Sequence, residues 1–121
     1  MIFAGLGFRK DAGIDSLRDA LARAGGGIIH ALATADDKAD APQIRALGAE
    51  LALPLHAIPL QVLQNQPTLT QSARVHARYG TGSLAEAAAL AAAGPGARLL
   101  GARVTSRDGR ATAALAERSP E

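Results

Sequence analysis

The alternation of short apolar runs with amphipathic segments constrains the fold of this chain more than any other feature. Apolar runs at residues 2–6, 28–33 and 55–60 predict buried strands. Between them, helical spacing of the apolar residues predicts a helix over 14–24 and a second one that begins at Pro42 and ends before Pro54. Strands separated by helices are typical of a layered α/β domain.

The second half of the chain continues this pattern and then changes it. We expect a loop or frayed helix over 61–70, a helix from Thr70 or Gln71 to Tyr79, and a helix over 83–93. Residues 98–105 and 110–116, joined by Ser106-Arg107-Asp108-Gly109, predict a β-hairpin. The expected fold is a three-layer α/β/α domain with a mixed sheet of about five strands and a C-terminal hairpin. Residues 1–116 form one domain, followed by a loose tail over 117–121.

Composition limits both the core and the partners. The chain has 29 alanines, but its only aromatic residues are Phe3, Phe8 and Tyr79. Small side chains allow close packing of helix on sheet. The scarcity of aromatics argues against stacking platforms for single-stranded nucleic acid, and a net charge of +2 is too small for duplex binding. Acidic small molecules remain plausible partners.

The chain has no cysteine, so thiolate metal sites and cysteine nucleophiles are excluded. His30, His56 and His76 are scattered and none has a helical i, i+4 partner, so we expect no metal and no cofactor. No signal peptide precedes the first apolar run, and no apolar stretch is long enough to span a bilayer. These features predict a soluble cytoplasmic protein.

Residues 80–86, Gly-Thr-Gly-Ser-Leu-Ala-Glu, precede the alanine-rich run of the 83–93 helix and predict a helix start with a capping box. In that arrangement Ser83 accepts from the backbone N–H of Glu86, and the Glu86 side chain returns to the Ser83 N–H. The free N–H groups of Gly80, Thr81 and Gly82 would then face an anion. The alternative is a well-made helix start that binds nothing. A nucleophilic Ser83 is disfavoured because the G-x-S-x-G pattern is missing.

Two further segments carry candidate chemistry. Gly5-Leu6-Gly7, followed by Phe8, Arg9 and Lys10, suggests a glycine turn that leaves a strand, but Lys10 stands where a dinucleotide site needs a third glycine. The alternative is a tight turn with solvated charges.

The second segment is a polar loop over 34–40, with Thr34, Asp36, Asp37, Lys38 and Asp40. It is either a cation or acid–base site, or a solvated loop that caps the following helix. Asp36, Asp37 and Lys38 are its candidate catalytic residues.

Five blocks, residues 5–9, 33–40, 53–55, 80–90 and 112–116, together resemble the CobE / CbiG C-terminal domain family of cobalamin biosynthesis. The resemblance runs nearly end to end. It implies an α/β/α domain that acts in corrin ring construction. One departure is Phe8, because the family often has a small residue or cysteine at that position, and a thiol role is therefore not expected.

In CbiG this domain follows other regions that are absent here, so the chain looks like the free-standing CobE form, and we do not transfer the lactone-opening hydrolase reaction. The resemblance implies binding or handing on of a precorrin intermediate, with other pathway enzymes as possible partners. An apolar wall for the macrocycle would come from Phe8, Leu84 and residues 61–70. The expected ligand-binding residues are Gly5, Gly7, Phe8, Arg9, Thr34, Asp36, Lys38, Gly80, Thr81, Gly82, Ser83 and Glu86. Two alternatives stay open: a hydrolase or isomerase that acts on a precorrin, and a non-catalytic interaction module.

Overall fold

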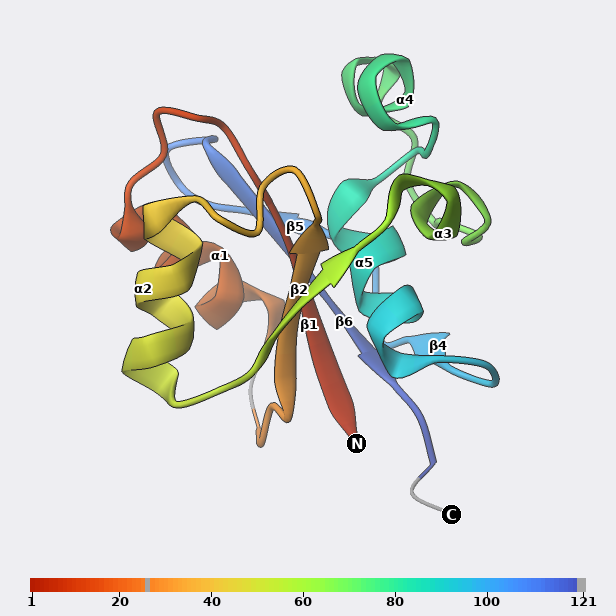
Figure 1. The fold of residues 1–121 in the computed structure, drawn as a ribbon, viewed down its shortest axis with the longest axis horizontal. Coiled ribbons are helices and arrows are strands. Elements are labelled where there is room, and N and C mark those ends of the chain that lie inside the picture. The colour runs from red at the N-terminus through yellow and green to blue at the C-terminus, as the bar shows by residue number, and fades with distance from the viewer. Residues whose placement is uncertain (26, 120–121) are drawn as a thin grey trace.

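The computed structural model describes residues 1–25 and 27–119. Six strands and five helices follow one another along these residues (Figure 1). In chain order they are β1 (Ile2–Phe8), α1 (Ile14–Ala24), β2 (Ala31–Ala35), α2 (Pro42–Leu51), β3 (Leu55–Ile58), α3 (Leu60–Gln64), α4 (Ala73–Tyr79), α5 (Leu84–Ala93), β4 (Arg98–Leu99), β5 (Val104–Thr105) and β6 (Ala111–Glu117).

The strands form one mixed sheet in the order β3-β2-β1-β6-β4, with β5 also paired to β6. The first three strands are parallel, and β6 runs antiparallel to β1 with Phe8 opposite Ala111. The predicted α/β class and mixed sheet are confirmed, with six strands in place of about five. Because β1 and β2 are parallel, the loops that follow them leave from the same edge of the sheet.

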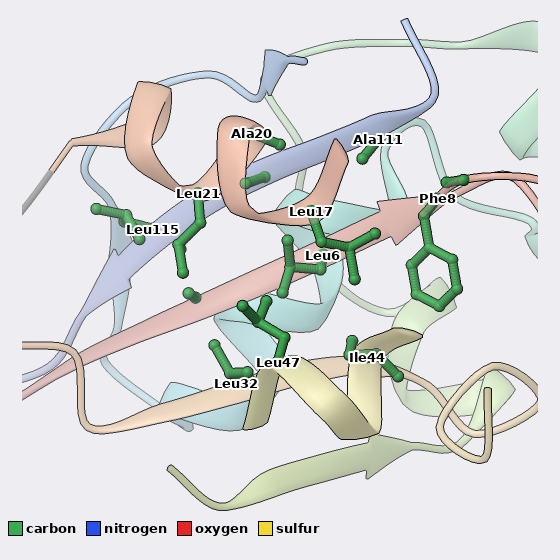
Figure 2. Packing of buried hydrophobic residues seen from close by; sticks show 13 residues of the cluster. Leu6, Phe8, Leu17, Ala20, Leu21, Leu32, Ile44, Leu47, Ala111 and Leu115 are labelled. Atoms are coloured by element: carbon green, nitrogen blue, oxygen red, sulfur yellow. The ribbon is translucent and has the colours of Figure 1, made fainter. Parts of the chain in front are cut away.

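Helices cover both faces of the sheet (Figure 1). On one face, α1 and α2 pack against β1, β2 and β6, and Figure 2 shows Leu6 of β1 beside Leu17 of α1 and Leu47 of α2. On the other face, α5 crosses β1, β2 and β6. The three-layer arrangement follows from the alternation along β1, in which Leu6 and Phe8 point to the first face and Gly5 and Gly7 to the second.

Small residues let α5 lie unusually close to the sheet. A Cβ on Gly5 would overlap the backbone oxygen of Ala85 and lie 2.6 Å from the backbone nitrogen of Ala89. Ala31, Ala33 and Ala35 of β2 are buried against the same layer. The alanine-rich composition therefore builds the core by close approach of backbones.

Two predicted loop segments lie inside strands. Since β1 extends to Phe8, Gly5 and Gly7 are strand residues, and the predicted glycine turn at 5–7 is wrong. Strand β2 begins at Ala31 and includes Thr34, which the sequence placed in a loop. The small side chains of β2 fit beneath α5, and the Thr34 hydroxyl finds a partner by donating to the Leu6 carbonyl at 2.8 Å. The large Ile28 stays outside the strand and is 78% exposed.

The C-terminal hairpin forms but is interrupted. Leu99 pairs with Ala116 and Val104 pairs with Ala113, so residues 100–103 bulge out of the ladder. Strand β6 extends through Glu117, which the sequence assigned to the tail. The next residue, Arg118, donates its backbone N–H to the Met1 carbonyl at 3.0 Å. Residues 120 and 121 of the predicted tail lie outside the described residues.

Within the described ranges, no helix has the length and apolar character that crossing a membrane requires.

Candidate functional site

A cleft of about 950 Å³ opens at the sheet edge where β1 ends. Its walls come from the residues after β1, the turn after β2, the start of α2, helix α4, the 100–103 bulge and the turn between β5 and β6. Apolar side chains among the lining residues include Phe8, Val75, Tyr79, Leu84 and Ala111. The volume lies at the upper end of the ~300–1,000 Å³ typical of ligand pockets.

The cleft is strongly positive, and we call it the basic cleft. Seven of the 13 lysines and arginines of the chain line it, whereas Asp37 is the only acidic residue among the described residues that does so. The seven cationic residues are Arg9, Lys10, Lys38, Arg74, Arg78, Arg103 and Arg110. Because they belong to five separate segments, only the folded chain concentrates this charge, and the concentrated charge favours an anionic ligand.

Lys38 lies in the turn after β2 and reaches back to the end of β1. Its Nζ donates to the Phe8 carbonyl at 2.8 Å and lies 4.9 Å from the centroid of the Phe8 ring. Partial burial lowers the pKa of Lys38, and the positive charges of Arg78 and Arg74 lower it further, while Asp37 acts in the opposite direction. Lys38 thus presents a cation that its surroundings make easier to deprotonate.

Asp37 joins the turn after β2 to helix α4. Its carboxylate accepts from the Tyr79 hydroxyl at 3.1 Å and from the Arg78 guanidinium at 3.2 Å. Burial raises the pKa of the Tyr79 phenol, so Tyr79 stays neutral and acts as the donor. Asp37 therefore positions the α4 wall, with Arg78 beside the cavity.

Asp108 holds the turn that carries Arg110. Its carboxylate accepts from the Ser106 hydroxyl at 2.6 Å, from the Ser16 hydroxyl of α1, and from the Arg110 backbone N–H at 3.1 Å. These hydrogen bonds lower the pKa of Asp108 to about 2. The turn is thereby tied to α1 and forms a fixed wall of the cleft.

The helix start at Ser83 forms, but only half of the predicted capping box does. The Ser83 hydroxyl accepts from the Glu86 N–H at 3.2 Å, as predicted. The Glu86 side chain does not return to the Ser83 N–H, so the reciprocal half of the prediction is wrong. Its carboxylate instead accepts from the Leu69 N–H at 2.5 Å, the Thr70 hydroxyl at 2.7 Å and the Arg103 N–H at 2.9 Å.

Glu86 is fully buried, so its charge depends on these partners. Burial alone would raise the pKa of Glu86, but the hydrogen bonds from Arg103, Thr70 and Leu69 outweigh it and the pKa is lowered. The buried carboxylate remains ionised and fastens two loops to the start of α5. One loop leads into α4 and the other contains Arg103, so Glu86 supports two walls of the basic cleft.

The glycines before Ser83 are covered by the end of α3 and by the loop that leads into α4. A Cβ on Gly80 would lie 2.6 Å from the Gln64 amide nitrogen, and one on Gly82 would lie 2.5 Å from the Thr70 carbonyl oxygen. The Gly82 carbonyl accepts the Ser72 N–H at 2.7 Å. The expected open helix N-terminus is therefore closed by the chain itself.

The structure brings together some of the predicted site residues. Gly7, Phe8, Arg9, Asp37 and Lys38 line the basic cleft, as do Lys10 and Leu84. Others lie outside its lining, namely Gly5, Thr34, Asp36, Gly80, Thr81, Gly82, Ser83 and Glu86. Residues 61–70, expected as part of an apolar wall, do not line the cleft either. The expected acid–base group is divided, because Asp37 faces the cleft and Asp36 does not.

Among the cleft residues that sequence reasoning missed are the charged and aromatic ones of the second half of the chain, Arg74, Arg78, Tyr79, Arg103 and Arg110. Arg74 and Arg78 are four residues apart on α4, a spacing that places both on one face of the helix. This spacing could have been recognised in the sequence. Arg103 reaches the cleft through the 100–103 bulge, for which the sequence offers no signal.

Within residues 1–25 and 27–119, no group of three or more histidine or acidic side chains is arranged to hold a metal ion. His30 instead accepts the Ile2 N–H at 3.0 Å, and His56 packs edge-on against the Phe3 ring.

Comparison with known proteins identifies a family that shares this fold. The family model described as cobalamin synthesis G C-terminus matches residues 2–116. The crystal structure of CobE, a protein from the cobalamin (vitamin B12) biosynthetic pathway, has a TM-score of 0.89 and 37% identity, covering 100% of this chain and 92% of CobE. The cobalamin biosynthesis protein chiG from Agrobacterium tumefaciens str. C58 has a TM-score of 0.74 and 33% identity, covering 98% of this chain and 99% of chiG.

A putative cobalamin biosynthesis protein G homolog from Sulfolobus solfataricus shares the fold, with a TM-score of 0.70, 21% identity and coverage of 95% of this chain and 36% of the homolog. A search of curated proteins found no match. The family model spans nearly the whole chain, and two solved structures above 30% identity align with it over nearly their full lengths. The chain therefore belongs to the CobE / CbiG C-terminal domain family of cobalamin biosynthesis proteins.

Proposed function

We propose that the protein binds a precorrin or corrinoid intermediate in the basic cleft and hands it on to another enzyme of cobalamin biosynthesis. The observation that carries the proposal is the cleft itself, in which seven cationic side chains surround an apolar lining. Corrinoid acids present acetate and propionate groups around a flat macrocycle. Arginine and lysine bind such carboxylates through charge-assisted hydrogen bonds.

The distribution of the cations suits a ligand with several carboxylates. Arg9 and Lys10 follow β1, Arg74 and Arg78 lie on α4, and Arg110 lies in the turn before β6. A single carboxylate would engage one of these segments, whereas a ring of carboxylates engages several at once. The Phe8 ring and the Leu84 side chain offer apolar surface to the macrocycle.

The hydrolase or isomerase alternative has less support. Its acid–base candidates do not form one group, because Asp36 lies outside the cleft and Asp37 is engaged with Arg78 and Tyr79. Of these three candidates, Lys38 is the one that lines the cleft without an ion pair to any described residue. The interaction-module alternative leaves the concentration of charge in a concave site without a role.

Calorimetric titration with hydrogenobyrinic acid tests the proposal. We expect Arg74→Ala and Arg110→Ala each to weaken binding by about tenfold or more, since a hydrogen bond to a charged group contributes roughly 1.5–3 kcal/mol. Arg98→Ala is the matched control, because Arg98 pairs with Glu117 at the opposite end of β6 and should bind like the wild type.

The fully esterified ligand is the chemical control, since it keeps the macrocycle and loses the negative charges. Equal affinity for acid and ester, or equal affinity of all variants, contradicts the proposal. Recovery of the ligand with its mass unchanged distinguishes binding from hydrolysis.

A further inference from the structure

The basic cleft contains both lysines of the chain, Lys10 and Lys38, among a majority of arginines. The two lysines differ in their surroundings. Lys10 is exposed, whereas Lys38 is partly buried and holds its Nζ 2.8 Å from the Phe8 carbonyl oxygen. In the part of the chain that the structure describes, no carboxylate forms an ion pair with Lys38. Its ammonium form therefore lacks the partner that most often stabilises it.

Arg74 and Arg78 work against the protonated amine of Lys38, whereas the charge of Asp37 favours it. Asp37, its sequence neighbour, directs its carboxylate to Arg78 and Tyr79. The guanidinium groups of Arg74 and Arg78 repel the ammonium, and partial burial removes water from it, so the pKa of Lys38 is lowered. Desolvation and a neighbouring cation are the two means by which proteins convert lysine into a nucleophile.

The hydrogen bond to the Phe8 carbonyl can be donated by a neutral amine as well as by an ammonium group. An uncharged amine retains two N–H donors and one lone pair, so Nζ can donate to the Phe8 carbonyl while its lone pair points elsewhere. Arginine offers no such lone pair, because it keeps its proton in proteins.

We propose that Lys38 is a carbonyl-reactive amine that captures an anionic aldehyde or ketone in the basic cleft as an imine. The Nζ lone pair attacks the carbonyl carbon, and proton transfer gives a carbinolamine. Loss of its hydroxyl group as water then forms the C=N bond. One amine and one carbonyl give one imine and one water, with no change of oxidation state. The neighbouring arginines hold the anionic groups of the ligand.

This inference shares its cleft with the proposed function but does not require a corrinoid ligand. Pyridoxal 5′-phosphate, an anionic aldehyde, serves as the probe, and cyanoborohydride reduces any imine to a stable amine that peptide mass spectrometry locates. Lys10 is the control within the same molecule. We expect Lys38 to be labelled about tenfold faster than Lys10 at neutral pH.

Arg74→Ala should reduce this preference, and Lys38→Arg should abolish the label at residue 38 while Lys10 is labelled as before. Formaldehyde carries no charge and tests the amine without the anion-binding groups, so Lys38 should retain a smaller advantage. Labelling of Lys10 as fast as Lys38 with both probes overturns the inference.

The two proposals fail separately. Loss of the lysine preference together with arginine-dependent binding of hydrogenobyrinic acid contradicts the imine alone. Preferential labelling of Lys38 without corrinoid binding contradicts the proposed function alone.

Discussion

Two regions at the same edge of the sheet offer hydrogen-bond donors to an anion, but only one of them is open. At the start of α5 the chain supplies its own anion, because the buried Glu86 carboxylate accepts from Leu69, Thr70 and Arg103. In the basic cleft, seven cationic side chains line the cavity and one described carboxylate, Asp37, faces them. A helix N-terminus attracts negative charge from any source. Here Ser83 caps the helix and Glu86 supplies a negative charge in its first turn, which leaves the side-chain cations of the cleft for a ligand.

The closed region also shapes the open one. Glu86 fixes the loop that leads into α4 and the bulge that contains Arg103, and both contribute to the cleft. Substitutions at the start of α5 should therefore lower the free energy of unfolding, with any effect on ligand binding being secondary. Substitutions in the basic cleft should weaken ligand binding and leave the free energy of unfolding nearly unchanged.

Gly5→Ala should have the largest effect, because it fills the space that lets α5 pack closely against β1. The added Cβ meets backbone atoms of Ala85 and Ala89, which cannot move aside without shifting the helix. We expect a loss of about 3 kcal/mol or more in the free energy of unfolding, or no folded protein. Urea denaturation followed by circular dichroism measures it. Gly101→Ala, with open space around its Cβ, is the control; equal stabilities of the two variants would show that α5 does not depend on this close approach.

Glu86→Gln should come next. The amide keeps the shape but brings an NH₂ group to a pocket filled with donors, so we expect a loss of about 2–3 kcal/mol at neutral pH. Glu50→Gln, at an exposed residue paired with Arg18, should have a much smaller effect. A Glu86→Gln variant as stable as Glu50→Gln would contradict the role of the buried carboxylate.

The effect of Glu86→Gln should depend on pH. The pKa of Glu86 is lowered by folding from its ordinary value of 4.5, so its contribution is fully present above that value and is lost as the pH falls through the lower folded-state pKa. The difference in unfolding free energy between wild type and variant should therefore shrink in acid. A difference that does not shrink on acidification would mean that the loss does not come from the charge of the Glu86 carboxylate.

Ser83→Ala separates capping from ligand binding. Loss of the cap should reduce stability by about 1 kcal/mol, and the affinity for hydrogenobyrinic acid should stay at the wild-type value. Thermal unfolding and calorimetric titration on the same sample provide both numbers. A tenfold loss of affinity from this variant would place the ligand at the α5 start instead of in the cleft.

Thr81→Val should have the smallest effect. The Thr81 hydroxyl is buried and has no hydrogen-bond partner among the described residues, so replacing it with a methyl group of similar size removes an unsatisfied polar atom. We expect a change within about 1 kcal/mol, neutral or stabilising. A larger destabilisation in the same unfolding assay would mean that the hydroxyl has a partner, such as a bound water.

Sequence reasoning succeeded where a pattern lies within a few neighbouring residues, and it failed where the structure depends on residues far apart in the chain. Helix α1 and the Ser83 cap were predicted because apolar spacing and capping are local. The glycines of β1 were misread as a turn, since a glycine that accommodates another helix looks the same in sequence as one that bends the chain. The hydrogen-bond partners of the Glu86 side chain include Leu69 and Arg103, each 17 residues away in the sequence. No local pattern encodes such a contact.

The residues of the basic cleft were predicted only in part for the same reason, because they come from separate segments of the chain. Arg9 and Lys38 were candidates because they adjoin predicted strands, whereas Arg103 and Arg110 join them only through the bulge and turn beside β6. The family resemblance pointed to a ligand with many carboxylates, and the sequence placed part of its site at residues 80–83, which do not line the cleft.

Mapping of backbone amide chemical shifts by NMR during titration with hydrogenobyrinic acid tests the central claim most directly. The account predicts that the largest shifts occur at Arg9, Lys10, Lys38 and Arg110, with Thr81 and Gly82 nearly unchanged. Shifts centred on residues 80–83, with the amides of the basic cleft unaffected, would contradict it.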